Sequence, residues 1–251
     1  MNVFELEKEL YKKLEIAKFT NDISLNGLQV GNREQEVKKI VFAVDASLSS
    51  IQGAIEVGAD MLFVHHGLFW GTPLAITGNH YERVKLLLDN NIALFACHLP
   101  LDANIPLGNN FQMALRMGIT HFDPFGEYKG MSIGFKGELP LEMSTEELSG
   151  LLNFAPSTGL KLFNYGKETN KTVAIVSGSA SELEDAIKEG VDCFITGEVK
   201  HSDFSTIVEN KINVIAGGHY QSEVFGVQAV GRMLEKEYGL ESVFLDYPSG
   251  L

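Results

Sequence analysis

Short apolar runs alternate with amphipathic segments along the chain, and the two patterns together predict a mixed α/β fold. Apolar residues recur every three or four positions from Phe4 to Ile16, with Glu and Lys between them, which predicts a surface helix. The β-branched run at 39–44 predicts a buried strand, the stretch 48–56 a helix, and the run 61–64 a second strand. Because strand, helix and strand require a crossover connection, we expect these strands to pair in parallel.

The same patterns predict further elements downstream. They are a helix at 81–89, a strand at 92–96, an added strand at 131–136, a helix at 144–152, a helix at 224–238 and a last strand at 242–245. The helix at 144–152 begins with Ser144 and carries Glu147 three residues later, which is the pattern of a capping box.

The second half of the chain repeats the first. Eight of the 22 residues from Lys39 to Asp60 are identical to the residues 132 positions later, without a gap. The matching residues of the second copy are Lys171, Val173, Val176, Ser179, Ala186, Ile187, Gly190 and Asp192. We therefore predict two α/β lobes of like topology related by internal duplication, at 1–126 and 127–251, with the C-terminal helix placed to pack back on the first lobe.

Composition is typical of a globular protein and disfavours nucleic acid as a partner. Of the 251 residues, 45% are hydrophobic and 21% are charged, and 33 acids against 20 bases give a formal net charge of −13. Binding to a phosphate backbone depends on Lys and Arg displacing counterions, and the sequence contains no basic run. These two features argue against nucleic acid as the partner.

We expect a cytoplasmic protein without a membrane span. No apolar run approaches the ~18 to 20 residues that a membrane helix requires, and the start MNVFELEKEL is acidic where a signal peptide would be basic. Cys97 and Cys193 each lie in an apolar segment, far apart in sequence. We interpret them as buried free thiols in a reducing compartment.

Histidines and carboxylates follow the predicted strands, where α/β proteins place their functional groups. His65 and His66 end one strand. Two further pairs share one spacing, a histidine followed four residues later by a carboxylate: His98 with Asp102, and His219 with Glu223. Nitrogen and oxygen donors without a Cys pair are typical of a catalytic site for Zn, Mn, Fe or Ni. The alternative is that the histidines only cap strand ends and the spacing arises by chance.

Two metal ions fit the adjacent pair His65 and His66 better than one. Neighbouring residues of an extended chain point to opposite sides, so we do not expect both to approach one ion. If each binds a different ion, a carboxylate must bridge the two, because an imidazole cannot offset the repulsion between two dications a few Å apart. Asp102 and Glu223 are both candidates for the bridge.

The loop that carries Glu198 and His201 occupies in the second lobe the place of the histidine pair in the first. In the repeat alignment, His65 and His66 fall on Gly197 and Glu198. If the lobes face each other across a pseudo-twofold axis, this loop points at the same cleft. We therefore expect a substrate or proton-transfer role for Glu198 and His201, with ordinary exposed polarity as the alternative.

At these residues the sequence resembles the GTP cyclohydrolase 1 type 2 family, also called the Nif-three-like proteins. The resemblance covers essentially the whole chain. Its motifs are specific when taken together, although none is specific alone. They are Asn26-Gly-Leu-Gln-Val-Gly31, Val64-His-His-Gly67, His98-Leu-Pro-Leu-Asp102 with Gly108-Asn109-Asn110, Thr196-Gly-Glu198 with His201, and Gly218-His219-Tyr220 with Glu223.

The resemblance implies two similar α/β lobes, a dinuclear metal centre in the cleft between them and a toroidal homohexamer. Carried over position by position, it implies that Glu223 bridges the ions and that His98 lies close to them. The implied metal ligands are His65, His66, Asp102, His219 and Glu223.

The family name implies a hydrolase in which water opens the imidazole ring of GTP and formate is released. The expected substrate is therefore a nucleotide or a related small molecule, and His98, Glu198 or His201 would move protons. Two other functions are compatible with the residues. One is a ring-shaped regulatory scaffold that binds metal and a ligand without turnover, and the weaker one is nucleic-acid binding.

Overall fold

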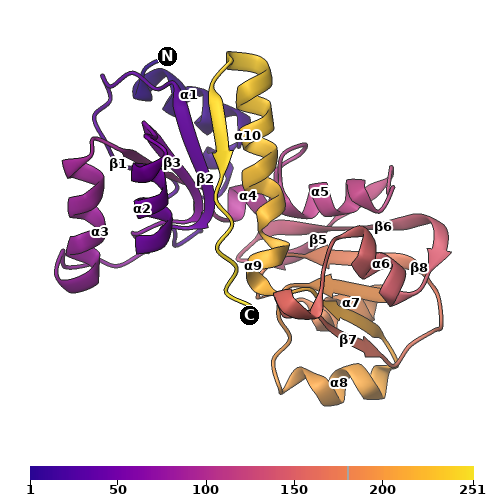
Figure 1. Ribbon diagram of the computed structural model, residues 1–251. Helices are drawn as coiled ribbons and strands as arrows, with labels where there is room; N and C mark the ends of the chain where they lie inside the picture. The colour runs from indigo at the N-terminus through magenta and orange to yellow at the C-terminus, as the bar shows by residue number, and fades with distance from the viewer. Residues whose placement is uncertain (180) are drawn as a thin grey trace. The chain divides into compact units, whose positions relative to one another are not determined.

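Buried parallel strands form the centre of each of the two units into which the chain divides. The computed structural model describes residues 1–179 and 181–251 (Figure 1). Unit 1 comprises Met1–Leu107 and Gly226–Tyr247, and unit 2 comprises Gly108–Phe225 and Pro248–Leu251.

Unit 1 contains a five-stranded sheet in the order β1-β4-β3-β2-β11, in which β1 is antiparallel to β4 and the other neighbours pair in parallel. The strands are β1 (Gly27–Val30), β2 (Lys39–Asp45), β3 (Met61–His66), β4 (Ala93–Ala96) and β11 (Glu241–Phe244). The helices are α1 (Val3–Lys13), the 3-10 helix η1 (Ile16–Lys18), α2 (Leu48–Glu56), α3 (Gly78–Asp89), α4 (Leu99–Ala103) and α10 (Val224–Tyr238).

Alternate residues of the central strands of unit 1 enter two different cores. Ile40 and Phe42 of β2 belong to a cluster with residues of α1 and α10. Val41 and Ala43 belong to a second cluster with residues of α2 and α3. The period of two along a strand thus places α1 and α10 on one face of the sheet and α2 and α3 on the other (Figure 1).

Unit 2 contains a six-stranded sheet in the order β5-β6-β8-β9-β10-β7, in which β8, β9 and β10 pair in parallel. The strands are β5 (Phe122–Tyr128), β6 (Met131–Met143), β7 (Lys161–Asn164), β8 (Asn170–Val176), β9 (Cys193–Thr196) and β10 (Asn213–Ala216). The helices are α5 (Asn109–Arg116), α6 (Thr145–Leu151), the 3-10 helix η2 (Pro156–Thr158), α7 (Leu183–Glu189), α8 (Asp203–Asn210) and α9 (His219–Ser222).

The repeat seen in the sequence corresponds to the same topology in both units. The parallel order β4-β3-β2 of unit 1 recurs as β10-β9-β8 in unit 2, and each series is flanked by an antiparallel strand, β1 or β7. The matching residues Asp60 and Asp192 form equivalent hydrogen bonds in the two units. Asp60 Oδ2 accepts from the backbone N–H groups of residues 38 and 39, and Asp192 Oδ2 accepts from those of residues 171 and 172. The two-lobe α/β fold is thereby confirmed.

Asp192 stabilises unit 2 in a way that depends on pH. Burial by itself raises the pKa of Asp192, but the Lys167 ammonium and the backbone donors outweigh it and lower the pKa to about 2, from the usual 3.8. A lowered pKa contributes stability above pH 4 that is lost as the pH falls through 2. We expect Asp192→Asn to lower the free energy of unfolding by about 2 kcal/mol at pH 7, measured by denaturant titration.

The difference between wild type and D192N should shrink as the pH falls from 4 towards 2. Asp89→Asn is the control, because Asp89 forms an exposed ion pair within α3 and should cost less than about 1 kcal/mol. A difference for D192N that stays constant across this pH range would show that the charge is not responsible.

The division between the units differs from the boundary expected after Gly126. It falls after Leu107, because α5 packs on the sheet of unit 2. In α5, Asn110 Nδ2 donates to Ile133 O on β6 at 2.8 Å, and the Phe111 ring lies 5.3 Å from that of Phe122 on β5. Helix α10, from Gly226 onward, and strand β11 belong to unit 1, where they contribute to its core and sheet.

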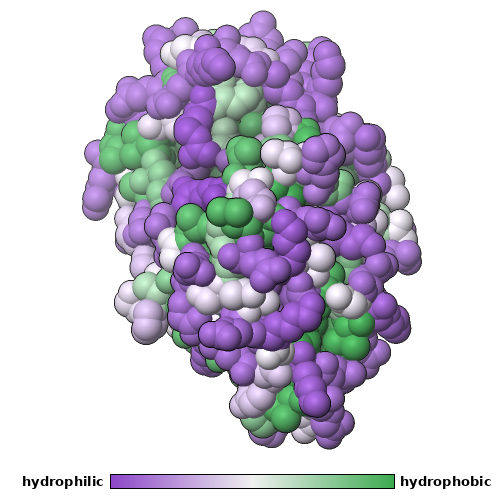
Figure 2. All heavy atoms as spheres, turned by 90° about the vertical axis from the view of Figure 1, so that its right-hand side faces the viewer, coloured by the Kyte–Doolittle hydropathy of each residue, from purple (hydrophilic) through white to green (hydrophobic). Residues whose placement is uncertain are grey.

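The exposed residues are mainly hydrophilic and the cysteines are buried, as the sequence indicates. On the face drawn in Figure 2, hydrophilic residues predominate and hydrophobic residues form separate small groups. Cys97 and Cys193 are buried and free, as predicted. None of the helices among the described residues combines the length and the apolar character that crossing a membrane requires.

Candidate functional site

In unit 1, a group of polar side chains lies beyond the carboxyl ends of three neighbouring parallel strands. His65 and His66 are the last residues of β3, and Asp45 is the last residue of β2. His98 follows β4 and begins α4, whose fourth residue is Asp102. This edge of a parallel sheet is where α/β folds gather functional side chains, because loops there carry them without disturbing the core.

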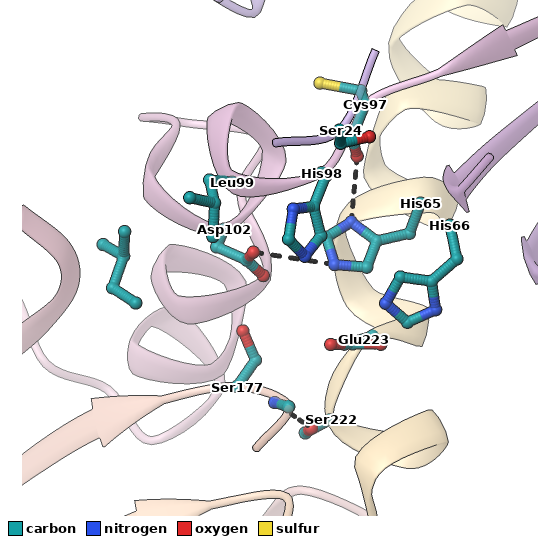
Figure 3. Close-up of polar contacts among 12 residues, drawn as sticks. Ser24, His65, His66, Cys97, His98, Leu99, Asp102, Ser177, Ser222 and Glu223 are labelled. Atoms are coloured by element: carbon teal, nitrogen blue, oxygen red, sulfur yellow. Dashed lines mark hydrogen bonds and ion pairs between the residues drawn. The ribbon is translucent and has the colours of Figure 1, made fainter. Parts of the chain in front are cut away.

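Three of the histidines of unit 1 are close enough together to bind one metal ion. One ring nitrogen from each of His65, His66 and His98 lies within 4.8 Å of the other two. His65 is fully buried, and its Nε2 lies 3.6 Å from Asp102 Oδ2, as Figure 3 shows. His66 and His98 are about one-fifth exposed. Within this unit, the structure thus brings these three histidines and Asp102 together.

The expectation that His65 and His66 point to opposite sides is wrong. Their ring centroids are 4.7 Å apart and their planes are inclined by 50°. Both histidines lie within β3, where the alternation fixes the direction of each Cα–Cβ bond but not of the ring beyond it, and each imidazole forms a hydrogen bond beside a different neighbouring strand. His65 Nδ1 contacts Cys97 O after β4, whereas His66 Nδ1 contacts Asp45 on β2.

Each of the histidines His65, His66 and His98 has its Nδ1 against an oxygen acceptor. The contacts are His65 with Cys97 O at 2.9 Å, His66 with Asp45 Oδ1 at 2.9 Å, and His98 with Asp22 Oδ1 at 3.0 Å. Carbonyl and carboxylate oxygens can only accept, so Nδ1 carries the hydrogen, and in the neutral ring the lone pair is on Nε2. This is how metal-binding histidines are commonly oriented in proteins.

Asp22 is a functional residue that the sequence did not reveal. Its side chain is 1% exposed and accepts from the backbone N–H of Ser24 and Leu99 and from Asn26 Nδ2. Burial raises the pKa of this carboxyl, but the hydrogen bonds and the His98 charge outweigh it, so the pKa is lowered. Asp22 therefore remains an anion that fixes the His98 ring.

In unit 2, His219 lies between two carboxylates. His219 begins α9 and Glu223 follows its last residue; His219 Nε2 is 3.1 Å from Glu223 Oε1, and its Nδ1 is 2.5 Å from Glu198 Oε1. Burial lowers the pKa of His219, but hydrogen bonds and charges from Glu223 and Glu198 raise it to about 9 overall. The two carboxylates therefore favour the protonated form of the imidazole.

Glycines allow the chain to approach Glu223 and to turn into α9. A Cβ on Gly178 would lie 2.5 Å from Glu223 Oε1, and a Cβ on Gly218 would lie 2.1 Å from Thr158 O. Both glycines have positive φ, +69° and +98°. These positions therefore accept no larger side chain without displacement of their neighbours.

His201 is the expected site residue that does not join a group. It is exposed in the turn before α8, and its carbonyl accepts from Phe204 N at 3.3 Å. Among the described residues, it belongs to none of the sets of three potential metal ligands. Glu198, by contrast, contacts His219 directly.

Comparison with known proteins identifies the family. A family model described as Duf34/NIF3 (NGG1p interacting factor 3) matches residues 1–249. The chain belongs to the DUF34/NIF3 family. Relatives named GTP cyclohydrolase 1 type 2 homolog occur in Archaeoglobus fulgidus, 43% identical, and in Treponema pallidum, 40% identical; in both, 100% of each chain is covered.

Solved structures of similar proteins agree with DUF34/NIF3 membership. The crystal structure of TTHA1606 from Thermus thermophilus is 40% identical with a TM-score of 0.89, and 100% of each chain is covered. Reduced HcgD from Methanocaldococcus jannaschii is 28% identical with a TM-score of 0.83, and 98% of each chain is covered. The resemblance read from the sequence motifs is thus confirmed, and with it the two-lobe α/β fold of a DUF34/NIF3 protein.

Proposed function

We propose that the protein is a hydrolase that uses two divalent metal ions and acts on a nucleotide, by opening the imidazole ring of GTP or by a related reaction of a small molecule. The proposed ligands are the five residues expected from the motifs, with Glu223 as the bridge: His65, His66, Asp102, His219 and Glu223. The relatives' name, GTP cyclohydrolase 1 type 2 homolog, supports the substrate class.

The observation that best supports a metal centre is the shared orientation of four histidines. In His65, His66 and His98, Nδ1 faces an oxygen acceptor, so Nε2 is the atom available to a metal ion. His219 Nδ1 likewise faces Glu198, and its Nε2 faces the Glu223 carboxylate. Buried carboxylates accompany them, Asp102 in unit 1 and Glu223 in unit 2. Imidazole and carboxylate donors suit Zn, Mn, Fe or Ni, so the residues fit such ions.

Two further residues, His98 and His201, are proposed to act in this reaction. Bound divalent ions supply Lewis acidity, which polarises the attacked bond and activates water at neutral pH. His98 accepts and returns the proton through Nε2, because Asp22 holds its Nδ1. His201 is exposed at the turn before α8 and is proposed to contact substrate there.

Glu198 is a positioning residue, because it acts through His219. We expect Glu198→Ala to weaken metal binding by about 10- to 100-fold, since it removes the acceptor that orients the ring. Glu198→Gln keeps an acceptor oxygen and should recover most of this loss. The measurement is competition with a chromophoric chelator, and Glu184→Ala, an exposed acid on α7, is the matched control. Equal affinities for E198A and E184A would contradict this role.

Metal analysis followed by turnover tests the proposed function. We expect two divalent ions per chain by elemental analysis, and release of formate from GTP that stops on chelation and returns with added metal. Metal-loaded protein that binds GTP but leaves it and other nucleotides intact would exclude the enzyme and favour the scaffold. We also propose a cytoplasmic homohexamer, for which light scattering should give six times the 27.6 kDa chain mass.

A further inference from the structure

The only tryptophan of the sequence, Trp70, lies against the histidine group of unit 1. Its ring centroid is 5.0 Å from that of His98, nearly perpendicular, and 5.9 Å from that of His66. Its Nε1 donates to Gly67 O at 3.0 Å, which fixes the orientation of the indole. The residue is half-buried beside the proposed ligand His66.

Two loops support Trp70. Leu25 N donates to Phe69 O at 3.0 Å, Gly71 N donates to Ile23 O at 2.5 Å, and Ser24 forms an isolated β-bridge with Trp70. The first loop begins at Asp22, the residue that holds His98. The backbone that carries the indole is therefore tied to the same segment that orients the histidine.

These two loops also expose aliphatic side chains. Ile23 and Leu25 of the first loop, and Leu74 and Ile76 after Trp70, are each at least half exposed. The side chain of Ile23 lies next to residue 71, since a Cβ on Gly71 would be 3.4 Å from Ile23 Cβ. Exposed aliphatic side chains are therefore present on both loops that meet at Trp70.

We infer that Trp70 holds the planar heteroaromatic ring of the substrate by stacking beside the histidines. This inference deepens the proposed function and rests on it for the choice of a nucleotide. A flat π surface next to aliphatic groups is complementary to a purine-like ring and has nothing to offer a phosphate chain. Trp70 is therefore a specificity-determining residue for the base.

Binding of two ligands that differ only in the nucleoside separates this role from metal chemistry. The ligands are GTP and inorganic triphosphate, titrated calorimetrically into the metal-loaded protein. We expect wild type to prefer GTP by about tenfold or more, the size expected for one base stacked on an aromatic ring. Trp70→Ala should abolish this preference without changing the affinity for triphosphate, and Trp70→Phe should retain most of it.

Fluorescence supplies a readout independent of turnover, because Trp70 is the only indole. GTP should quench the emission of wild type, and triphosphate should not. Leu88→Ala, at an exposed position on α3, is the control and should bind both ligands as wild type does. A W70A variant that keeps the GTP preference, or loses affinity for both ligands equally, would overturn the inference. Stacking without any hydrolysis would instead remove the proposed function and leave the inference standing.

Discussion

Replacing His65 by asparagine is expected to remove metal from the protein and to lower GTP turnover by more than about 100-fold. This exceeds the loss that follows when a residue that only orients a metal ligand is removed. His65 is fully buried, its Nδ1 is held by Cys97 O, and its Nε2 faces the Asp102 carboxylate. Asparagine is too short to reach the same position. The measurement is metal content by elemental analysis together with formate release.

The effect of H65N must be distinguished from unfolding. His66→Asn changes a half-buried residue of the same group and should also lose metal, with a smaller effect on the thermal midpoint. His121→Asn is the matched control, because this exposed histidine is bonded to the neighbouring Thr120 hydroxyl and lies outside the groups of potential ligands among the described residues. Metal content and turnover equal to wild type in H65N would contradict its role as a ligand.

Gly218→Ala should destabilise unit 2 by about 3 kcal/mol or more, because the change combines backbone strain with a steric clash. The φ of Gly218 is +98°, and a Cβ there would lie 2.1 Å from Thr158 O. His219 follows directly, and its N–H donates to Leu251 O at 2.7 Å. Relief of the clash must therefore move the start of α9, so metal affinity should fall together with stability.

Gly190→Ala separates strain from clash. Gly190 also has positive φ, +68°, but a Cβ there would meet nothing within 4 Å. We expect G190A to cost about 1 kcal/mol, the left-handed penalty alone, and to leave metal affinity unchanged. Denaturant titration of both variants gives the comparison. Equal losses in G218A and G190A would show that the approach to Thr158 is unimportant.

The sequence predicts those parts of the fold that depend on local pattern. The strands around 40–44 and 61–64 are recognisable because they are apolar runs bounded by turn residues, and the Ser144 capping box is a local signal that the structure confirms at α6. Strand β5 was not predicted, because Pro124 and Gly126 interrupt its pattern. Antiparallel pairing with β6 holds this segment as a strand, although its local sequence does not favour one.

The residues missed at the site depend on contacts between distant segments. Asp45 reaches His66 because the parallel register of β2 and β3 sets the two residues side by side. Asp22 reaches His98 across 76 positions of sequence. Neither the register nor this loop contact has a signature in residue spacing. A carboxylate at the end of a predicted parallel strand, as at Asp45, is the one signal that would have helped.

Diffraction from crystals grown with Mn or Zn, with anomalous data at the metal edge, tests the metal centre most directly. We expect a pair of peaks about 3.5 to 4 Å apart, contacted by Nε2 of His65, His66 and His219, with Glu223 reaching both. Crystals of protein shown to contain the metal, in which the ions lie elsewhere or are bound through Nδ1, would contradict the proposed metal centre.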